Sequence, residues 1–143
     1  MKIRRMIKGD LDRVYEIGSV CTAFTVSDTG ECFWPKAALL RWCQSRQDLM
    51  LIAKEGDELI GFAFFACHRP TGKVILENLW VHPTWRRCKI ATCLLDEAWR
   101  RLQRRQFLIV TALVNTRNTA SRHAFQSLGL KSGFSFLWMD RSL

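Results

Sequence analysis

Three cations stand together where an apolar segment gives way to a helical pattern. Residues 85–92 contain Arg86, Arg87 and Lys89, follow the apolar run 73–81, and lead into apolar residues at helical spacing. The free backbone N–H groups and the dipole of a helix N-terminus attract anions, and neighbouring cations add charge-assisted hydrogen bonds. This segment is therefore a candidate site for an anionic group. A solvated basic helix face is the plainer alternative.

One carboxylate lies inside the apolar run that precedes this loop. Strict alternation along a strand places Glu77 on the same face as Ile75, Leu79 and Val81. Apolar neighbours remove water from a carboxylate and raise its pKa, which suits the group to accept a proton near neutral pH. The other interpretation is that Glu77 forms an ion pair with an arginine.

Strand and helix patterns alternate along the chain and position these groups. The predicted strands cover residues 2–6, 49–54, 59–67, 73–81, 107–113 and 134–139. The predicted helices begin at Gly9-Asp10, near Pro35, at Ile90 and at Asn118, and the last of them is stopped by Gly129. The turn 55–57 should join two of the strands in a hairpin, and His82-Pro83 should end the run 73–81.

Composition sets the broad class. The 143 residues are 48% hydrophobic and 24% charged, which predicts one folded domain spanning 1–143 rather than a disordered chain. No apolar run approaches the ~20 residues of a membrane span, and no export signal opens the chain, so a cytoplasmic protein without membrane contact is expected. The six cysteines form no C-x-x-C pair, which favours reduced thiols, and no histidine or cysteine spacing predicts a metal site.

Charge is distributed unevenly. Residues 1–58 carry nine cations and nine anions, whereas residues 59–143 carry thirteen and four and so hold the whole net charge of +9. Residues 85–105 alone are net +5, which favours an anionic partner. A basic nucleic-acid-binding module is one candidate class, although no motif of the usual nucleic-acid readers is present.

Two motifs together resemble the GNAT superfamily of acyl-CoA-dependent N-acyltransferases. Residues 79–95, LWVHPTWRRCKIATCLL, resemble the family's strand, V-x-P corner and R/Q-x-x-G-x-G/A loop. Residues 118–130 resemble its N-x-x-A/S-x-x-x-Y-x-x-x-G-F helix, and the resemblance covers nearly the whole chain. It implies an α/β (α+β) fold with a single mixed, mostly antiparallel sheet of six to seven strands, flanked by about four helices.

The resemblance also implies a cofactor site. The pantetheine arm of acetyl-CoA would run beside Leu79, Trp80 and Val81, and the loop would hold the pyrophosphate through Arg86, Arg87, Cys88, Lys89, Ile90 and Ala91. Asn118 would bond the cofactor's amide or simply cap its helix, and Phe125 would wall the pantetheine or pack in the core. Cys88 is either a modifiable thiol or an inert side chain.

This chain departs from the family pattern at two places. The family normally has glycine at the position of Lys89, and often at the position of Arg87. Lys89 therefore either weakens pyrophosphate binding by the loop, or its ammonium group replaces part of the contact that the backbone loses with the phosphates. Phe125 stands where the usual general acid is a tyrosine, and nothing places the only tyrosine, Tyr15, near the thiolate. A thiol with a pKa of ~8.5 is a tolerable leaving group, so water could supply that proton and the general acid is unassigned.

The function expected from the resemblance is transfer of an acetyl group from acetyl-CoA to a primary amine by direct attack, with Glu77 as general base. A catalytically silent acyl-CoA-binding domain and the nucleic-acid module are the alternatives. The acceptor would be a small molecule or a protein N-terminus, recognised within residues 11–47, where Phe33 and Trp34 are candidate lining residues. The net charge disfavours a polycation, nucleic acid is not an expected partner, and a homodimer is left open.

Overall fold

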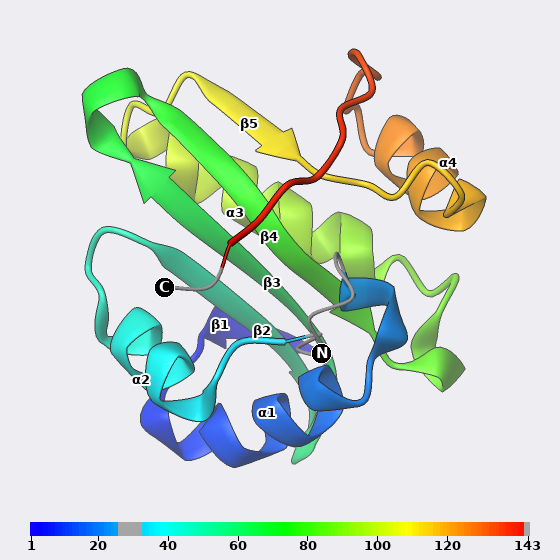
Figure 1. Ribbon diagram of the computed structural model, residues 1–143. Coiled ribbons are helices and arrows are strands. Elements are labelled where there is room, and N and C mark those ends of the chain that lie inside the picture. Colours follow the sequence, from blue (N-terminus) through cyan, green and yellow to red (C-terminus); the bar gives the residue numbers. More distant parts are fainter. Residues whose placement is uncertain (26–32, 142–143) are drawn as a thin grey trace.

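One mixed sheet organises the chain. The computed structural model describes residues 1–25 and 33–141. Within them the strand order is β1-β2-β3-β4-β5, with every neighbouring pair antiparallel except β4 and β5, which are parallel. The strands are β1 Lys2–Arg5, β2 Leu49–Glu55, β3 Glu58–His68, β4 Lys73–Val81 and β5 Ile109–Ala112 (Figure 1). The mixed, mostly antiparallel sheet predicted from the sequence is confirmed, with five strands instead of six to seven.

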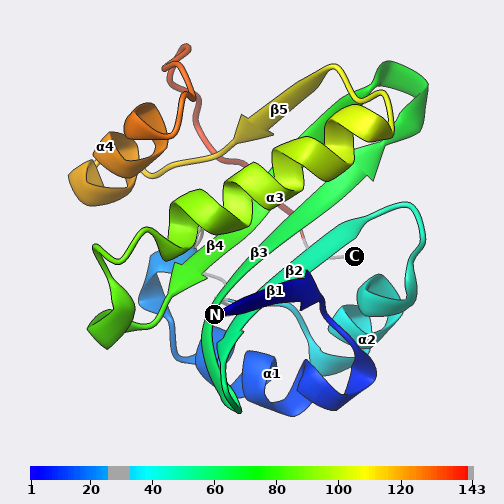
Figure 2. The same cartoon turned by 180° about the vertical axis from the view of Figure 1, so that it is seen from behind.

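Helices cover both faces of this sheet. The four helices are α1 Leu11–Ser19, α2 Lys36–Gln44, α3 Ile90–Arg104 and α4 Thr119–Ser127. Figures 1 and 2 show α1 and α2 on one face and α3 on the other, with α4 beyond the end of β5. Each face has its own core cluster, one packed under α3 and the other under α1 and α2.

The packing of α3 fixes where the basic loop lies. Its buried residues recur at three- and four-residue intervals and form one stripe, made of Ile90, Leu94, Leu95, Ala98 and Leu102. A Cβ atom added at Gly61 of β3 would lie 3.0 Å from the Ile90 side chain and 3.1 Å from the Trp80 carbonyl oxygen. The missing side chain at Gly61 therefore lets the first turn of α3 lie directly on the sheet.

The predicted strand over residues 134–139 is not formed. Phe134, Phe136, Leu137 and Met139 are at least 83% exposed, and no strand is assigned beyond β5 in the described residues. A strand needs a partner for its backbone groups, and the outer edge of β5 offers only four residues, fewer than the seven predicted over 107–113. An alternating apolar pattern alone does not supply that partner.

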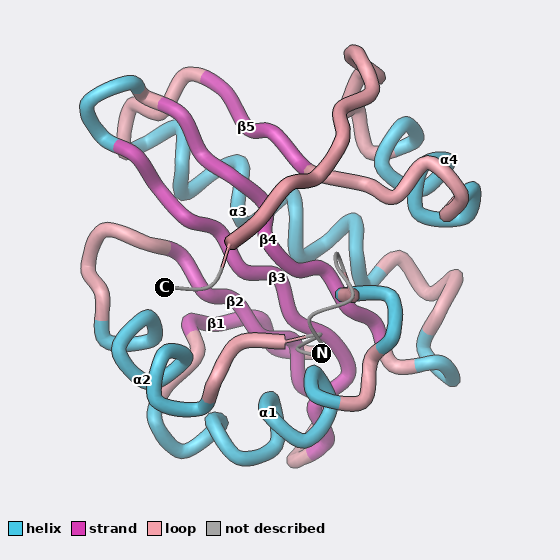
Figure 3. The backbone as a smooth tube through the Cα atoms, viewed as in Figure 1, coloured by secondary structure: helices cyan, strands magenta, loops and turns pink. Residues whose placement is uncertain are grey.

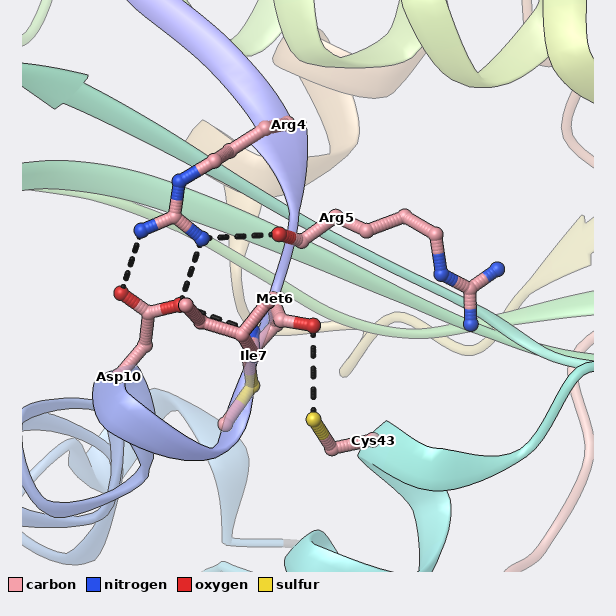
Figure 4. A network of polar contacts seen from close by, with 6 residues as sticks. All are labelled: Arg4, Arg5, Met6, Ile7, Asp10 and Cys43. Carbon is pink, nitrogen blue, oxygen red and sulfur yellow. Dashed lines mark hydrogen bonds and ion pairs between the residues drawn. The ribbon is translucent and has the colours of Figure 1, made fainter.

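The first strand is tied to both α1 and α2 by polar contacts (Figure 4). Arg4 donates to the two carboxylate oxygens of Asp10 at 2.7 and 2.8 Å, and the Ile7 amide donates to the same carboxylate at 2.8 Å. The Cys43 thiol of α2 donates to the Met6 carbonyl at 3.4 Å. Asp10 is the residue before α1, as predicted, but its carboxylate does not cap the helix because Arg4 and Ile7 occupy it.

Two further observations concern the class of protein. None of the helices in the described ranges is long and apolar enough to cross a bilayer. Five of the cysteines, Cys21, Cys43, Cys67, Cys88 and Cys93, are not in disulfides, while Cys32 lies outside the described residues. Burial raises the pKa of the Cys43 and Cys67 thiols, so these two side chains behave as core residues rather than as nucleophiles.

Asp10→Asn should destabilise the protein in a pH-dependent way. Burial raises the pKa of Asp10, but the bonds from Arg4 and Ile7 outweigh it and leave the pKa lowered. The contribution is therefore complete above the unfolded value of ~3.9 and is lost as pH falls through the lower folded value. Hydrogen bonds to charged groups contribute ~1.5–3 kcal/mol, and the low end applies here because Arg4 is partly exposed. Urea unfolding at pH 7 should therefore show that Asp10→Asn lowers the free energy of unfolding by about 1.5 kcal/mol.

As pH falls below ~3.9 the difference between wild type and Asp10→Asn should shrink, and it should be lost once the pH is below the folded pKa of Asp10. Asp12→Asn is the matched control, since the ion pair of Asp12 with Lys36 is exposed and its loss should change little. A difference between wild type and Asp10→Asn that stays equally large as pH falls below ~3.9 would contradict this role of the carboxylate.

Candidate functional site

β4 contains one residue more than the stretch of β3 opposite it. Phe64 lies opposite Asn78 and Phe65 lies opposite Leu76, so Glu77 has no partner on β3. This is a β-bulge, which bends the strand and changes the facing of the residues that follow. The strict alternation predicted from the sequence is therefore wrong at this point.

The bulge separates the residues predicted to share a face with Glu77. Val74 and Leu76, before the bulge, and Leu79 and Val81, after it, all pack in the cluster under α3. Ile75 alternates with Val74 and Leu76, so it lies on the opposite face from Leu79 and Val81. One inserted residue thus keeps Leu79 and Val81 on the same α3 side of β4 as Val74 and Leu76.

Pairing between β4 and β5 stops just before Glu77. The parallel register runs from Lys73 opposite Ile109 to Leu76 opposite Ala112, where β5 ends. Figure 3 shows the chain leaving β5 toward α4 while β4 continues. In the described residues, positions 77–81 of β4 therefore have no strand partner on this side, and their backbone groups face an open edge.

Glu77 is half-buried at the head of this open edge. Burial alone raises the pKa of its carboxyl group, and it has no ion pair within residues 1–25 and 33–141. The alternative interpretation, in which Glu77 pairs with an arginine, is not what the structure shows. A desolvated carboxylate without a cation is a stronger proton acceptor than an ordinary glutamate.

Two residues of the basic loop have a backbone conformation that glycine adopts more readily than other residues. After the 3-10 turn Pro83–Trp85, Arg87 has φ 65° and Lys89 has φ 61°, both in the left-handed region. These are the two positions where the GNAT resemblance implies glycine. A non-glycine residue in this conformation costs ~1–2 kcal/mol, a strain that glycine would avoid at both positions.

The loop leads directly into the N-terminus of α3. Lys89 is the residue before the helix, and its carbonyl accepts the first helical hydrogen bond, from Cys93 at 2.9 Å. The amides of the first turn therefore have no carbonyl to bond and remain available to an anion. Arg86, Arg87, Cys88 and Lys89 are exposed, Ala91 is half-buried, and Ile90 is in the core. Three cations and several free amides thus surround one short stretch of backbone.

Trp80 faces away from α3, unlike its neighbours Leu79 and Val81. Its ring stacks on Phe62 at 5.5 Å and meets the His82 ring edge-on at 5.7 Å. The His82 ring is held in turn by Thr84, at 2.8 Å from its hydroxyl. The predicted cofactor-strand residues therefore divide between the two faces of the sheet.

Asn78 is a site residue that the sequence reading missed. It is the one buried polar side chain among the described residues, and the Trp34 indole N–H donates to its Oδ1 atom at 2.7 Å. An amide next to Glu77 in an otherwise apolar strand was the available signal. The bond attaches the segment before α2 to the bulged part of β4.

Phe33, predicted with Trp34 to line an acceptor site, packs against the same face. Its ring stacks on Phe24 at 5.5 Å and approaches Phe62 at 6.1 Å. A Cβ atom added at Gly18 would lie 2.1 Å from the Phe33 ring, so only glycine leaves room for it. The aromatic rings beside β4 are thus fixed by close packing.

The two predicted residues around α4 have structural roles. Asn118 accepts a hydrogen bond from the Ser121 amide at 3.0 Å, which confirms it as the helix cap, and Phe125 packs at the edge of the α3 cluster. Gly129 follows the helix with φ 89°, as predicted. Tyr15 packs on the α1 and α2 side. Contact of Asn118 or Phe125 with a cofactor stays a prediction.

The sequence matches one family model over most of its length. The model of the acetyltransferase (GNAT) family covers residues 12–130. A sequence comparison with curated proteins gives no significant match.

Several solved N-acetyltransferases share the fold. PaiA N-acetyltransferase from Thermoplasma acidophilum, solved with coenzyme A, is 24% identical, with a TM-score of 0.81 over 94% of this chain and 92% of that one. The ribosomal-protein-S18-alanine N-acetyltransferase from Escherichia coli is 19% identical, with a TM-score of 0.73 over 93% and 79%. An aminoglycoside antibiotic 6'-N-acetyltransferase from Acinetobacter haemolyticus is 17% identical, with a TM-score of 0.71 over 100% and 99%. At these identities the likeness establishes the fold.

Lys89→Gly should stabilise the protein. Glycine removes a left-handed strain of ~1–2 kcal/mol and costs ~0.5–1 kcal/mol of backbone entropy, so the free energy of unfolding should rise by about 0.5–1 kcal/mol in a urea titration. Arg86→Gly is the control in the same loop, because Arg86 has φ −64° and gains nothing from glycine. A Lys89→Gly variant destabilised as much as Arg86→Gly would contradict the left-handed backbone.

Proposed function

The chain belongs to the acetyltransferase (GNAT) family, and from this we propose that residues 1–143 form one domain that transfers an acetyl group from acetyl-CoA to a primary amine. One observation carries the proposal. The bulge puts a half-buried carboxylate, Glu77, where β4 loses its β5 partner, at the head of an open strand edge that leads to the basic loop. A proton acceptor and an anion cradle thus lie on one continuous stretch of chain.

The residues of that stretch fit the donor. The unpaired backbone edge at Leu79, Trp80 and Val81 offers N–H and C=O groups to the amides of a pantetheine arm. The first-turn amides of α3, with Arg86, Arg87 and Lys89, offer donors and positive charge to a pyrophosphate. When bound, acetyl-CoA supplies the thioester whose acyl group is transferred.

Glu77 is the proposed general base. An amine near neutral pH is largely protonated and cannot attack, so Glu77 takes its proton, directly or through one water. The free amine then attacks the thioester carbonyl carbon, so that the C–N bond forms and the C–S bond breaks. The attacking nitrogen loses its second proton to water as the amide forms. The thiolate leaves and takes a proton from water, since Phe125 has none to give. The role proposed for the chain is to activate the amine and to fix the donor.

The acceptor is proposed as a class rather than a compound. Two of the similar structures are named for an alanine of ribosomal protein S18 and for aminoglycosides, which are a protein and a class of small molecules. The aromatic rings Phe24, Phe33, Phe62 and Trp80 lie on the face opposite α3, beside the bulged strand. A small amine or a protein N-terminus is therefore proposed, and the net charge of +9 disfavours strongly cationic acceptors of either class.

Glu77→Gln should separate chemistry from binding. Removing a general base lowers kcat by ~10²–10⁴-fold, while calorimetry with acetyl-CoA should give a nearly unchanged dissociation constant. The test uses a panel of small amines, aminoglycosides and peptides with a free N-terminus. Because burial raises the pKa of Glu77, the wild-type rate should fall with decreasing pH at a higher pH than an ordinary glutamate would give, and Glu77→Gln should lack this limb.

Glu58→Gln, at the exposed first position of β3 and outside residues 11–47, is the control and should keep wild-type kinetics. Wild-type turnover in Glu77→Gln would remove Glu77 from the mechanism. Binding of acetyl-CoA without turnover of any amine would favour the catalytically silent domain. No binding of acetyl-CoA would exclude both the acetyltransferase and the silent acyl-CoA-binding domain.

A further inference from the structure

Five arginines line one hollow at the opposite end of α3 from the basic loop. The hollow has a volume of about 310 Å³ and is lined by Arg5, Arg46, Leu49, Arg101, Arg104 and Arg105. The 15 residues of α3, at ~1.5 Å per residue, put it roughly 20 Å from the proposed cofactor loop. Figure 2 shows this end of α3 beside the turn that connects α2 to β2.

The arginines reach the hollow from three separate parts of the chain. Arg5 ends β1, Arg46 lies between α2 and β2, and the other three close α3. Figure 4 shows the Arg5 side chain extending away from the Arg4 and Asp10 pair. Cations at the C-terminus of a helix stabilise its dipole, which accounts for those on α3. It does not account for Arg5 and Arg46, which come from other elements.

Most of this charge is not neutralised by the protein. Arg101 bonds Glu97 at 2.5 Å, but no other lining arginine has a carboxylate partner in the described residues. Arg5 donates to the carbonyls of Ser45 and Asp48 at 2.8 and 3.1 Å, and Arg105 donates to the carbonyl of Gln47. Carbonyls orient these guanidinium groups without cancelling their charge, so the hollow keeps a strong positive potential.

We propose that this arginine hollow binds clustered phosphate groups, as a site separate from the proposed cofactor loop. A guanidinium group presents paired N–H donors that match phosphate oxygens, and each phosphate offers enough oxygens to accept from two arginines at once. The same chemistry is carried by a free oligophosphate and by a nucleic-acid strand. A carboxylate-rich peptide, with one charge spread over each side chain, matches the converging guanidinium groups less well.

The test measures binding of a fluorescein-labelled oligouridylate by anisotropy over a salt series, with acetyl-CoA at saturation. Arg46→Gln with Arg104→Gln removes two exposed cations of the hollow whose side chains donate no hydrogen bond to any residue within 1–25 and 33–141, so the fold should persist. Affinity should fall ~10-fold or more at low salt, and the slope of log K against log salt should shrink by about 1.4, at ~0.7 per phosphate contact. Arg41→Gln with Arg141→Gln, two exposed arginines outside the hollow, should change affinity less than ~2-fold.

Competition identifies the source of the phosphates. Displacement of the oligouridylate by sodium tripolyphosphate indicates a free oligophosphate, and resistance to it indicates a nucleic-acid strand; either supports the site. Three results would overturn it: no binding, equal losses in the two double variants, or displacement by polyglutamate as effective per charge as by tripolyphosphate. The titration is repeated without acetyl-CoA. Oligouridylate binding that appears only when acetyl-CoA is absent would also overturn the proposal, because the oligouridylate would then occupy the loop.

Discussion

The structure depends on a single extra residue in β4. Because Glu77 has no partner on β3, the strand bends, and Leu79 and Val81 share the α3 side with Val74 and Leu76. Pairing with β5 ends at Leu76, just before the bulge. The same insertion leaves the carboxylate half-buried and without a cation in the described residues, which raises its pKa. The bulge thus puts a proton acceptor beside the open backbone edge that begins where β5 ends.

The two ends of α3 show how one helix can serve two anions. At its N-terminus, free amides and left-handed residues form a narrow cradle, in which backbone geometry matters as much as charge. At its C-terminus, arginines from three parts of the chain converge on a hollow and charge dominates. The excess positive charge of the second half of the sequence therefore lies mainly at two sites with different chemistry. A count of cations along the chain does not distinguish these two sites.

The sequence predicted the elements whose patterns are local. The hairpin of β2 and β3, the span of β4, and the Asn118 cap follow from turn residues, apolar length and capping chemistry. It failed where structure depends on distant partners. Alternation of apolar residues could not show that Glu77 is an inserted residue. The apolar pattern over 134–139 has no strand edge to pair with. Arg5 and Arg46 reach the hollow only through the tertiary fold. The left-handed backbone at Lys89 could not be predicted from lysine, which rarely adopts it.

A crystal structure with acetyl-CoA tests the central claim most directly, namely that a loop without glycine still holds a coenzyme's pyrophosphate. The expected density places the phosphate oxygens within hydrogen-bond distance of the amides that open α3, with the Lys89 side chain turned outward and the thioester beside Glu77. A Lys89 side chain that fills the cradle, with no nucleotide bound at saturating acetyl-CoA, would contradict it.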